Sequence, residues 1–147
     1  MSQTTWSGPL ASGDINAGKT GGPNIGLALL SQTVLINFDA TLVQNGTVYL
    51  PYKSQIVDII VDVLTQYDSA TSATLSVGTS SAATTYASGV NVKTGIRVLP
   101  TFTAAQLAAM DDIGTNGTVV ATVTSVGQPT VGQVRVTYRY VQTTAND

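Results

Sequence analysis

The sequence predicts an all-β protein, specifically a jelly-roll-like antiparallel β-sandwich with an extended N-terminal arm. From Leu29 onward apolar and polar residues alternate with period 2, which is the pattern of half-buried strands. Short segments of this kind follow one another at regular spacing, separated by clusters of Gly, Asn and Ser. The chain has 147 residues, which favours a single domain whose core needs no disulfide or metal ion.

Residues 1–30 form the predicted arm, and residues 31–147 form the predicted β-sandwich domain. The segments 7–13 and 18–24 are rich in Gly and Pro, and no period of 2 or 3.6 survives between them. A structureless stretch of this length is uncommon inside a compact domain, so we expect the arm to lie on a neighbouring protein. The residues predicted to anchor it there are Trp6, Pro9, Leu10, Ile15 and Ile25.

The domain is predicted to begin with a strand through residues 34–42, where every even position is apolar. Asn45-Gly46 then predicts a hairpin turn, because a type I′ turn needs positive φ at both central positions. Residues 48–50 resume an extended chain that runs up to Pro51.

Residues 55–67 form the most regular predicted strand. Their β-branched side chains are nearly continuous, and stiffness at χ1 favours a pleated strand over the competing helix. Simple alternation assigns Val57, Ile59, Val61 and Val63 to one face, and Ile56, Asp58, Ile60, Asp62 and Leu64 to the other.

The rest of the chain predicts five more short strands and one short helix. The strands are expected at residues 73–77, 86–92, 95–99, 118–124 and 133–141. The helix is expected at residues 104–110 with Thr103 as its N-cap, and Asn116-Gly117 is a second hairpin-type pair. Tyr138 and Tyr140 share the apolar face of the last strand, which predicts core packing. Eight strands favour a jelly roll, and a seven-stranded immunoglobulin-like sandwich is the alternative.

The composition lacks most of the side chains on which catalysis and metal binding depend. The chain contains no Cys, His or Glu, so the commonest general base, thiolate nucleophiles and the commonest metal ligands are missing. We therefore expect that the protein is not an enzyme, and that it has no catalytic residue, cofactor or metal ion.

The charge distribution argues against several classes of partner. Charged residues make up 10% of the chain, against about 25% in typical domains, which suggests that much of the surface contacts other protein. A net charge of −2 and scattered basic residues give no electrostatic reason to expect nucleic-acid binding. No segment has the roughly 20 apolar residues of a membrane span, and no signal peptide is visible, so we expect synthesis in a cytoplasm and no membrane contact.

Residues 13–20 match the phosphate-binding pattern G-x-x-x-x-G-K-[ST] at every defined position. That mechanism needs a buried strand before the loop and a helix that begins at the lysine. Here Gly8 and Pro9 precede the motif, and Gly21-Gly22-Pro23 would break a helix in its first turn. We interpret the motif as a chance match and expect no nucleotide.

Two aspartates and two arginines are the remaining candidates for a site. Asp58 and Asp62 could form a calcium or paired-carboxylate site. Four residues of extended strand separate them by roughly 13 Å, which is too far to share one ion or proton. Arg135 and Arg139 could pair with these aspartates across a sheet or a subunit boundary, or they could be outward charges that protect an edge strand.

Three segments resemble a recurrent structural protein of tailed phages: LPYKSQIVDIIVDVLTQY at 50–67, ATLSVGT at 73–79 and YASGV at 86–90. The segment WSGPL at 6–10 is also similar to the N-termini of small virion proteins that many phages encode near the capsid gene. The similarity covers roughly the first two-thirds of the chain, and it transfers no site residues.

The resemblance implies a jelly-roll capsid decoration (cement) protein. Such proteins are usually homotrimers that bind the major capsid protein on the outer surface of the virion capsid and stabilise the shell by bridging neighbouring subunits. The alternative is a phage tail, fibre or head-fibre component with a glycan-binding or stalk-joining β-module.

Overall fold

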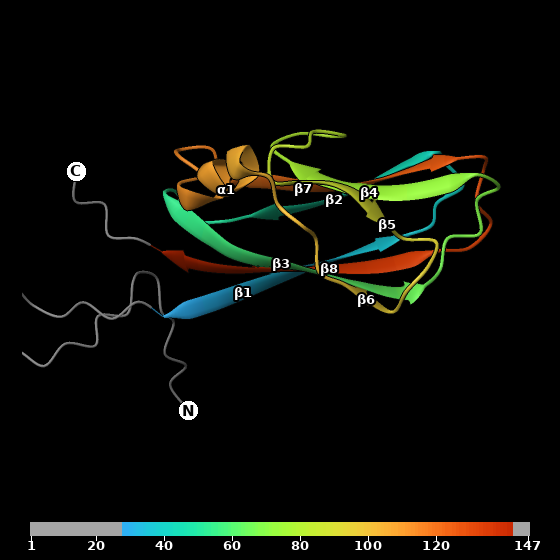
Figure 1. The fold of residues 1–147 in the computed structure, drawn as a ribbon, viewed down its shortest axis with the longest axis horizontal. Helices are drawn as coiled ribbons and strands as arrows, with labels where there is room; N and C mark the ends of the chain where they lie inside the picture. The colour runs from blue at the N-terminus through green and yellow to red at the C-terminus, as the bar shows by residue number, and fades with distance from the viewer. Residues whose placement is uncertain (1–27, 143–147) are drawn as a thin grey trace, which may run out of the picture.

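The computed structural model describes residues 28–142, which form two four-stranded antiparallel sheets packed face to face (Figure 1). The first sheet has the strand order β1-β8-β3-β6, and the second sheet has the order β2-β7-β4-β5. The strands are β1 (Leu29–Asn37), β2 (Val43–Tyr49), β3 (Ser54–Thr65), β4 (Ser72–Gly78), β5 (Ala87–Asn91), β6 (Arg97–Val98), β7 (Thr118–Val126) and β8 (Gln133–Gln142).

The strand order is that of a jelly roll. The first strand pairs with the last, β2 pairs with β7, β3 with β6 and β4 with β5, as in one long hairpin that has been rolled up. Two further antiparallel pairs, β3 with β8 and β4 with β7, complete the sheets. The predicted all-β sandwich of jelly-roll type is therefore confirmed, and the seven-stranded immunoglobulin-like alternative is wrong.

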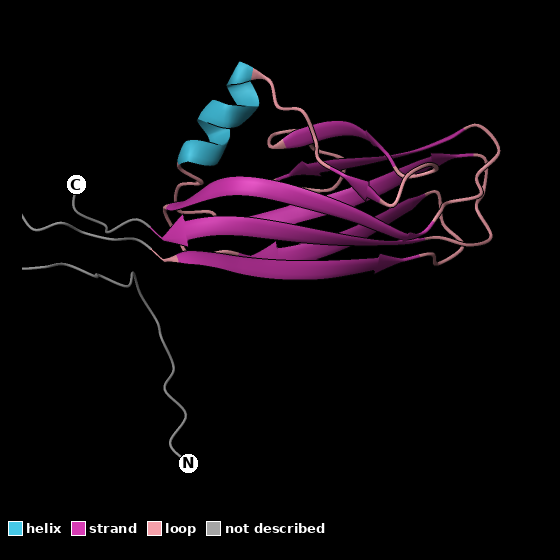
Figure 2. Ribbon diagram, turned by 60° about the horizontal axis from the view of Figure 1, so that its bottom comes forward, coloured by secondary structure: helices cyan, strands magenta, loops and turns pink. Residues whose placement is uncertain are grey.

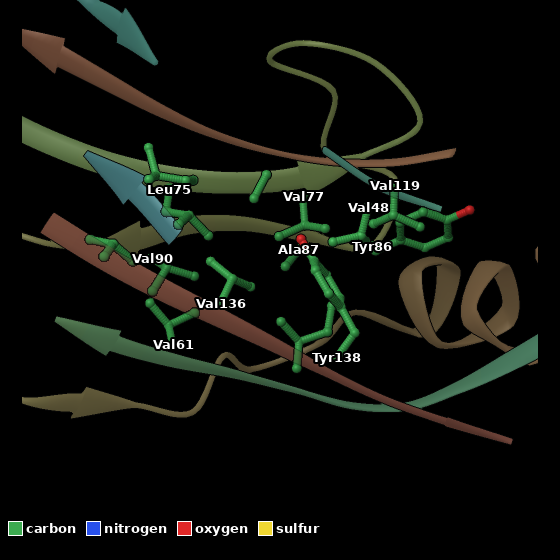
Figure 3. Close-up of a cluster of buried hydrophobic side chains, with 14 of the residues drawn as sticks. Val48, Val61, Leu75, Val77, Tyr86, Ala87, Val90, Val119, Val136 and Tyr138 are labelled. Atoms are coloured by element: carbon green, nitrogen blue, oxygen red, sulfur yellow. The ribbon is translucent and has the colours of Figure 1, made fainter. Parts of the chain in front are cut away.

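The core lies between the two sheets and is built mainly from β-branched side chains. Val61, Val136 and Tyr138 of the first sheet point toward Leu75 and Val77 of the second (Figure 3). All five side chains are fully buried. Burial of each such side chain contributes about 1.5–3 kcal/mol to folding, so these facing strands hold the sheets together.

A β-bulge in β3 changes the faces that simple alternation predicts. The register of β3 with β8 shifts between Ile56 and Asp58, so that Val57 is an extra residue in the strand. As a result Ile56 is buried in the core and Val57 is exposed, the reverse of the prediction. Beyond the bulge the predicted alternation is confirmed, with Ile59 and Val61 buried.

The predicted hairpin turn at Asn45-Gly46 is wrong, because both residues lie in the middle of β2. Gly46 faces the opposite sheet, and a Cβ on it would lie 2.8 Å from side-chain carbons of Val34 and Ile36. The glycine is required for close sheet packing rather than for a turn. The chain instead turns before β2 at Ala40, which has a φ of 64°.

The second predicted hairpin pair, Asn116-Gly117, also fails to connect two paired strands, since it lies between the helix and β7. Asn116 Oδ1 accepts a hydrogen bond from the backbone N–H of Thr118 at 3.2 Å. A Cβ on Gly117 would lie 2.0 Å from the carbonyl oxygen of Leu50, so this position is restricted to glycine by a backbone contact. In both Asn-Gly pairs, therefore, the glycine is required by a close packing contact and not by a hairpin turn.

The predicted helix is confirmed as α1 (Ala104–Asp111), and Thr103 caps it as predicted. The Thr103 hydroxyl accepts from the Gln106 N–H at 3.2 Å, and the Gln106 side chain accepts from the Thr103 N–H at 2.9 Å, which completes a capping box. Within residues 28–142 no helix has the length and apolar character needed to cross a membrane.

Strand β1 begins and β8 ends at one end of the sandwich, where Leu29 is opposite Val141 (Figure 2). Helix α1 lies at the same end, because Ile113, just after it, bonds through its N–H to the carbonyl of Ser54, and Ser54 is opposite Gln142. We call this the helix end. Strand β1 starts two residues before the predicted domain boundary at residue 31.

Candidate functional site: the arginine face of the first sheet

The predicted arm anchors Trp6, Pro9, Leu10, Ile15 and Ile25 lie outside the described residues, as does the 13–20 motif. Their predicted role in protein contact therefore stays a prediction. The candidate site described below comes from residues of the β-sandwich.

Charge is distributed unequally between the two sheets. The four strands of the second sheet contain no charged residue. All charged residues located in strands belong to the first sheet: Asp58, Asp62, Arg97, Arg135 and Arg139. These include every arginine of the chain. The outer surface of the first sheet is therefore the cationic side of the sandwich, with three arginines and two aspartates.

Alternation in β8 explains why its arginines point outward. Val134 and Val136 are buried between the sheets, so Arg135 between them faces solvent. Arg135 is opposite Asp62 in the β3–β8 register, and Arg97 is opposite Asp62 in the β3–β6 register. Pairing of three strands therefore places both guanidinium groups beside one carboxylate.

Asp62 binds both arginines. Its Oδ1 accepts from Arg97 Nε at 2.6 Å, and its Oδ2 accepts from Arg135 Nη2 at 2.9 Å and Nε at 3.3 Å. The aspartate is only 6% exposed. The Arg97 hydrogen bond holds the pKa of the Asp62 carboxyl below its ordinary value, with the Arg135 bond and both positive charges adding to the effect and desolvation opposing it. Asp62 is thus an ionised group that orients two arginines.

The two guanidinium groups remain open to solvent on their outer side, since 60% of the Arg97 side chain is exposed. They line a shallow depression together with Asp62, Leu64 and Ile96. Ile96 is 83% exposed, and Leu64 is also exposed. Exposed apolar side chains next to fixed arginines are typical of protein interfaces rather than of solvated surface.

Leu35 of β1 is exposed and lies opposite Arg135 in the β1–β8 register, so it extends the apolar part of this surface. Farther along β8, Arg139 is opposite Asp58. We use the term arginine face for this surface, which comprises Leu35, Asp62, Leu64, Ile96, Arg97, Arg135 and Arg139.

The predicted pairing of the aspartates with the arginines is confirmed within the sheet for Asp62 and Arg135. Asp58 instead accepts a hydrogen bond from the backbone N–H of Ile59 at 2.8 Å. Within residues 28–142 no cluster of three or more Asp, Glu, His or Cys side chains could hold a metal ion. Tyr138 and Tyr140 are buried, which confirms their predicted place in the core.

Sequence reasoning missed Arg97 and Ile96. Arg97 is the first residue of the two-residue strand β6 and Ile96 directly precedes it. Arg97 reaches Asp62 only because β6 pairs with the end of β3. The sequence offers one signal, the apolar segment 95–99 with a single arginine in it, but that signal does not reveal the strand with which it pairs.

No protein family, curated protein or solved structure matches the chain in comparisons with each of these sets.

Proposed function

We propose that this chain is a virion structural protein that decorates and stabilises a bacteriophage capsid by bridging neighbouring capsid subunits. The observation that supports it best is the arginine face, in which exposed Leu64 and Ile96 flank two arginines fixed by one carboxylate. The resemblance of segments 50–67, 73–79 and 86–90 to a tailed-phage structural protein points to the same role. In this proposal the protein is a homotrimer on the outer surface of the capsid and has no catalytic activity.

The arginine face suits a partner that is both acidic and apolar. Three arginines outnumber two aspartates on this surface, although the whole chain has a net charge of −2. Asp62 restricts Arg97 and Arg135 before any partner arrives, so less side-chain entropy is lost on binding. The proposed partner is an acidic, apolar surface of the major capsid protein, with Trp6, Pro9, Leu10, Ile15 and Ile25 as additional anchors.

Binding to phage heads tests the proposal directly. The full-length protein is mixed with DNA-filled heads of the phage that encodes it, prepared from a mutant that lacks this gene, and binding is measured by co-sedimentation. We expect saturable binding that weakens as salt increases, because exposed charges are screened, and heads that resist heat better when the protein is bound. Absence of binding to these heads would overturn the proposal.

An Ile96→Ser/Arg139→Gln double variant tests whether the arginine face makes the contact. Both side chains are exposed, so the fold should survive the change. We expect at least about a tenfold loss of affinity for heads, the effect of losing 1.4 kcal/mol of binding free energy. A Tyr49→Ser variant is the matched control on the other sheet and should bind normally. Normal binding by the double variant would place the contact elsewhere.

One observation favours a fibre-type module with a glycan site as the second candidate. Tyr49 and Tyr52 are 70% and 69% exposed. They lie near one another at the helix end, since Tyr49 is opposite Thr118 and the Tyr52 ring lies near Gly117. Exposed aromatic rings bind sugars well because they offer apolar area with little entropy loss. Binding to host glycans that Tyr49→Ser abolishes, with none to heads, would favour this function.

A further inference from the structure

The two sheets leave two long open edges on the same side of the sandwich. Strand β1 is an edge of the first sheet, and β2 is an edge of the second. They have nine and seven residues. At the opposite edges, β6 has two residues and β5 has five with an irregular register. Edge strands are usually kept short or irregular because they pair readily with other chains, so β1 and β2 are the exceptions here.

Hydrogen bonding shows which backbone groups are open in β1. Next to β1, the Phe38 N–H bonds to the Gly132 carbonyl of the β8 side. Because antiparallel pairing alternates, even-numbered residues of β1 bond to β8, and Ser31, Thr33 and Leu35 direct their N–H and C=O groups to the open edge.

The same reasoning applies to β2. The Leu50 N–H bonds to the Gly117 carbonyl of the β7 side, so the groups of β2 that point to the edge belong to Val43, Asn45, Thr47 and Tyr49. Of these, the Val43 carbonyl accepts from the Thr41 hydroxyl at 2.8 Å. Within residues 28–142, each edge therefore offers a row of backbone donors and acceptors that have no partner strand, at every second residue.

Neither edge carries the features that normally prevent pairing. The sequences of the two strands, LLSQTVLIN and VQNGTVY, contain no charged residue and no proline. The registers of β1 with β8 and of β2 with β7 run without a bulge. Lysine, proline and bulges are the devices that natural sheets use to block an edge. Both edges are therefore chemically suited to receive another uncharged strand.

The two edges are close together and run in opposite directions. Gly46 of β2 packs against Val34 and Ile36 of β1, which brings the strands together. Strand β1 begins at the helix end. Strand β2 finishes at that end, because Tyr49 is followed within five residues by Ser54, which is opposite Gln142 of β8. Rotation about an axis parallel to the strands preserves strand directions, so β1 of one copy would lie antiparallel to β2 of the next.

We propose that β1 of one copy of this chain pairs with β2 of a second copy, and that successive pairs close a ring. A two-fold axis perpendicular to the strands would pair β1 with another β1, whereas closure about an axis parallel to the strands uses two different edges from each copy. The chain offers two such edges on one side, both uncharged, so that identical copies meet without repulsion. That the ring contains three copies rests on the proposed function. The contact between β1 and β2 does not depend on it.

Paired cysteines test this contact cleanly because the natural chain contains no cysteine. Full-length Thr33→Cys/Thr47→Cys is treated with a short bis-maleimide crosslinker, whose reach tolerates a one-residue difference in register. Crosslinked trimers on a denaturing gel are the expected product. Thr33→Cys alone and Thr47→Cys alone are the controls and should give only monomers, since each copy would then lack one half of the contact.

Dimers from Thr33→Cys alone would overturn the ring in favour of a two-fold pairing of β1 with itself. Monomers from the double variant, together with a monomeric mass by light scattering, would also overturn it and would leave residues 1–27 or another protein to cover the edges. A Thr33→Pro variant is the independent check. Its missing N–H faces the open edge, where proline is tolerated, so the fold should survive, with circular dichroism unchanged, while the oligomer dissociates.

The outcome is distinguishable from that of the proposed function. Crosslinked rings that fail to bind phage heads would leave this contact standing and remove the capsid role. Heads that bind the protein as separate monomers would support the capsid role and remove the contact.

Discussion

Asp62 and Arg135 are direct cross-strand partners between β3 and β8, with Oδ2 of the aspartate 2.9 Å from Nη2 of the arginine. On its other side the same carboxylate binds Arg97 of β6 at 2.6 Å. Strand β6 pairs with β3 through Val98 opposite Val61 and Arg97 opposite Asp62, with one further bond from the Val63 N–H to the Ile96 carbonyl at 2.7 Å. The ion pair therefore reinforces a short strand contact.

Asp62→Asn is expected to lower the free energy of unfolding by about 1.5–3 kcal/mol, the range for hydrogen bonds to charged groups. The amide retains one acceptor oxygen, so it cannot satisfy both arginines, and it carries no charge. Urea denaturation followed by circular dichroism measures the effect. Asp58→Asn is the matched control on the same strand, because asparagine can still accept the Ile59 N–H. Equal effects of the two substitutions would contradict the bridging role of Asp62.

The stabilisation from Asp62 should also depend on pH. Its pKa in the folded protein lies below the ordinary value of 3.8, because of the bonds to Arg97 and Arg135. The folded state therefore favours the ionised carboxylate, and the contribution is complete above 3.8 and lost as pH falls through the depressed pKa. The stability difference between the natural chain and Asp62→Asn should shrink as the pH falls below 3.8. A difference that stays constant in acid would show that charge is not its source.

The sequence predicts the existence of most elements in this protein because alternation is a local property. It predicts their ends less well, since the strand predicted at 34–42 is observed at Leu29–Asn37. The helix is predicted at 104–110 and ends at Asp111, and the longest strand is predicted at 55–67 and observed at Ser54–Thr65. Asn45-Gly46 fails as a turn because the local preference of the pair for a turn is overridden by packing against Val34 and Ile36. The bulge at Val57 could not be predicted from the sequence of β3 for a similar reason, since a bulge is defined by the register of β3 with β8.

The candidate site depends on contacts between distant residues, and for that reason the sequence reveals only half of it. Asp62 and Arg135 are 73 residues apart, and Asp62 and Arg97 are 35 apart. Alternation predicts that the Asp62 side chain is on the opposite face of the sheet from Val61. Which residues lie next to Asp62 depends on strand order and register, which the sequence does not reveal. The exposure of Ile96 beside the arginines likewise becomes visible only once β6 is placed next to β3.

Gly46→Ala is expected to destabilise the protein by about 1–3 kcal/mol through overpacking. The added Cβ would lie 2.8 Å from side-chain carbons of both Val34 and Ile36, so at least one of them must move. Val34→Ala removes one of these contacts. The double variant should therefore be more stable than the sum of the two single effects predicts. Thermal and urea unfolding of all four proteins measure the coupling, and strict additivity would show that the two positions do not compete for space.

Tyr138→Phe is expected to raise the free energy of unfolding by about 1 kcal/mol. The Tyr138 hydroxyl is buried and has no hydrogen-bond partner among the described residues. An unsatisfied buried hydroxyl costs about 1–3 kcal/mol relative to water, and phenylalanine fills the same space without that cost. Tyr140→Phe is the comparison on the same strand. A loss of stability in Tyr138→Phe would mean that a buried group satisfies the hydroxyl in solution.

Alkaline pH should unfold the protein through its buried tyrosines. Burial, with a smaller contribution from the charge of Asp39, raises the pKa of Tyr67 to about 12, and burial also raises the pKa of Tyr138. An unfolded tyrosine has an ordinary pKa of 10.0. Above that pH the unfolded chain loses protons that the folded chain retains, so stability is complete below pH 10 and falls as pH rises toward 12.

Urea midpoints measured across this pH range, with tyrosinate absorbance recorded in parallel, test the expectation. Tyr67→Phe should flatten part of the decline, because phenylalanine has no proton to lose in either state. If the urea midpoint falls equally steeply with pH in Tyr67→Phe and in the natural chain, the alkaline transition belongs to the remaining buried tyrosines. Of these, Tyr138 lies deepest in the core.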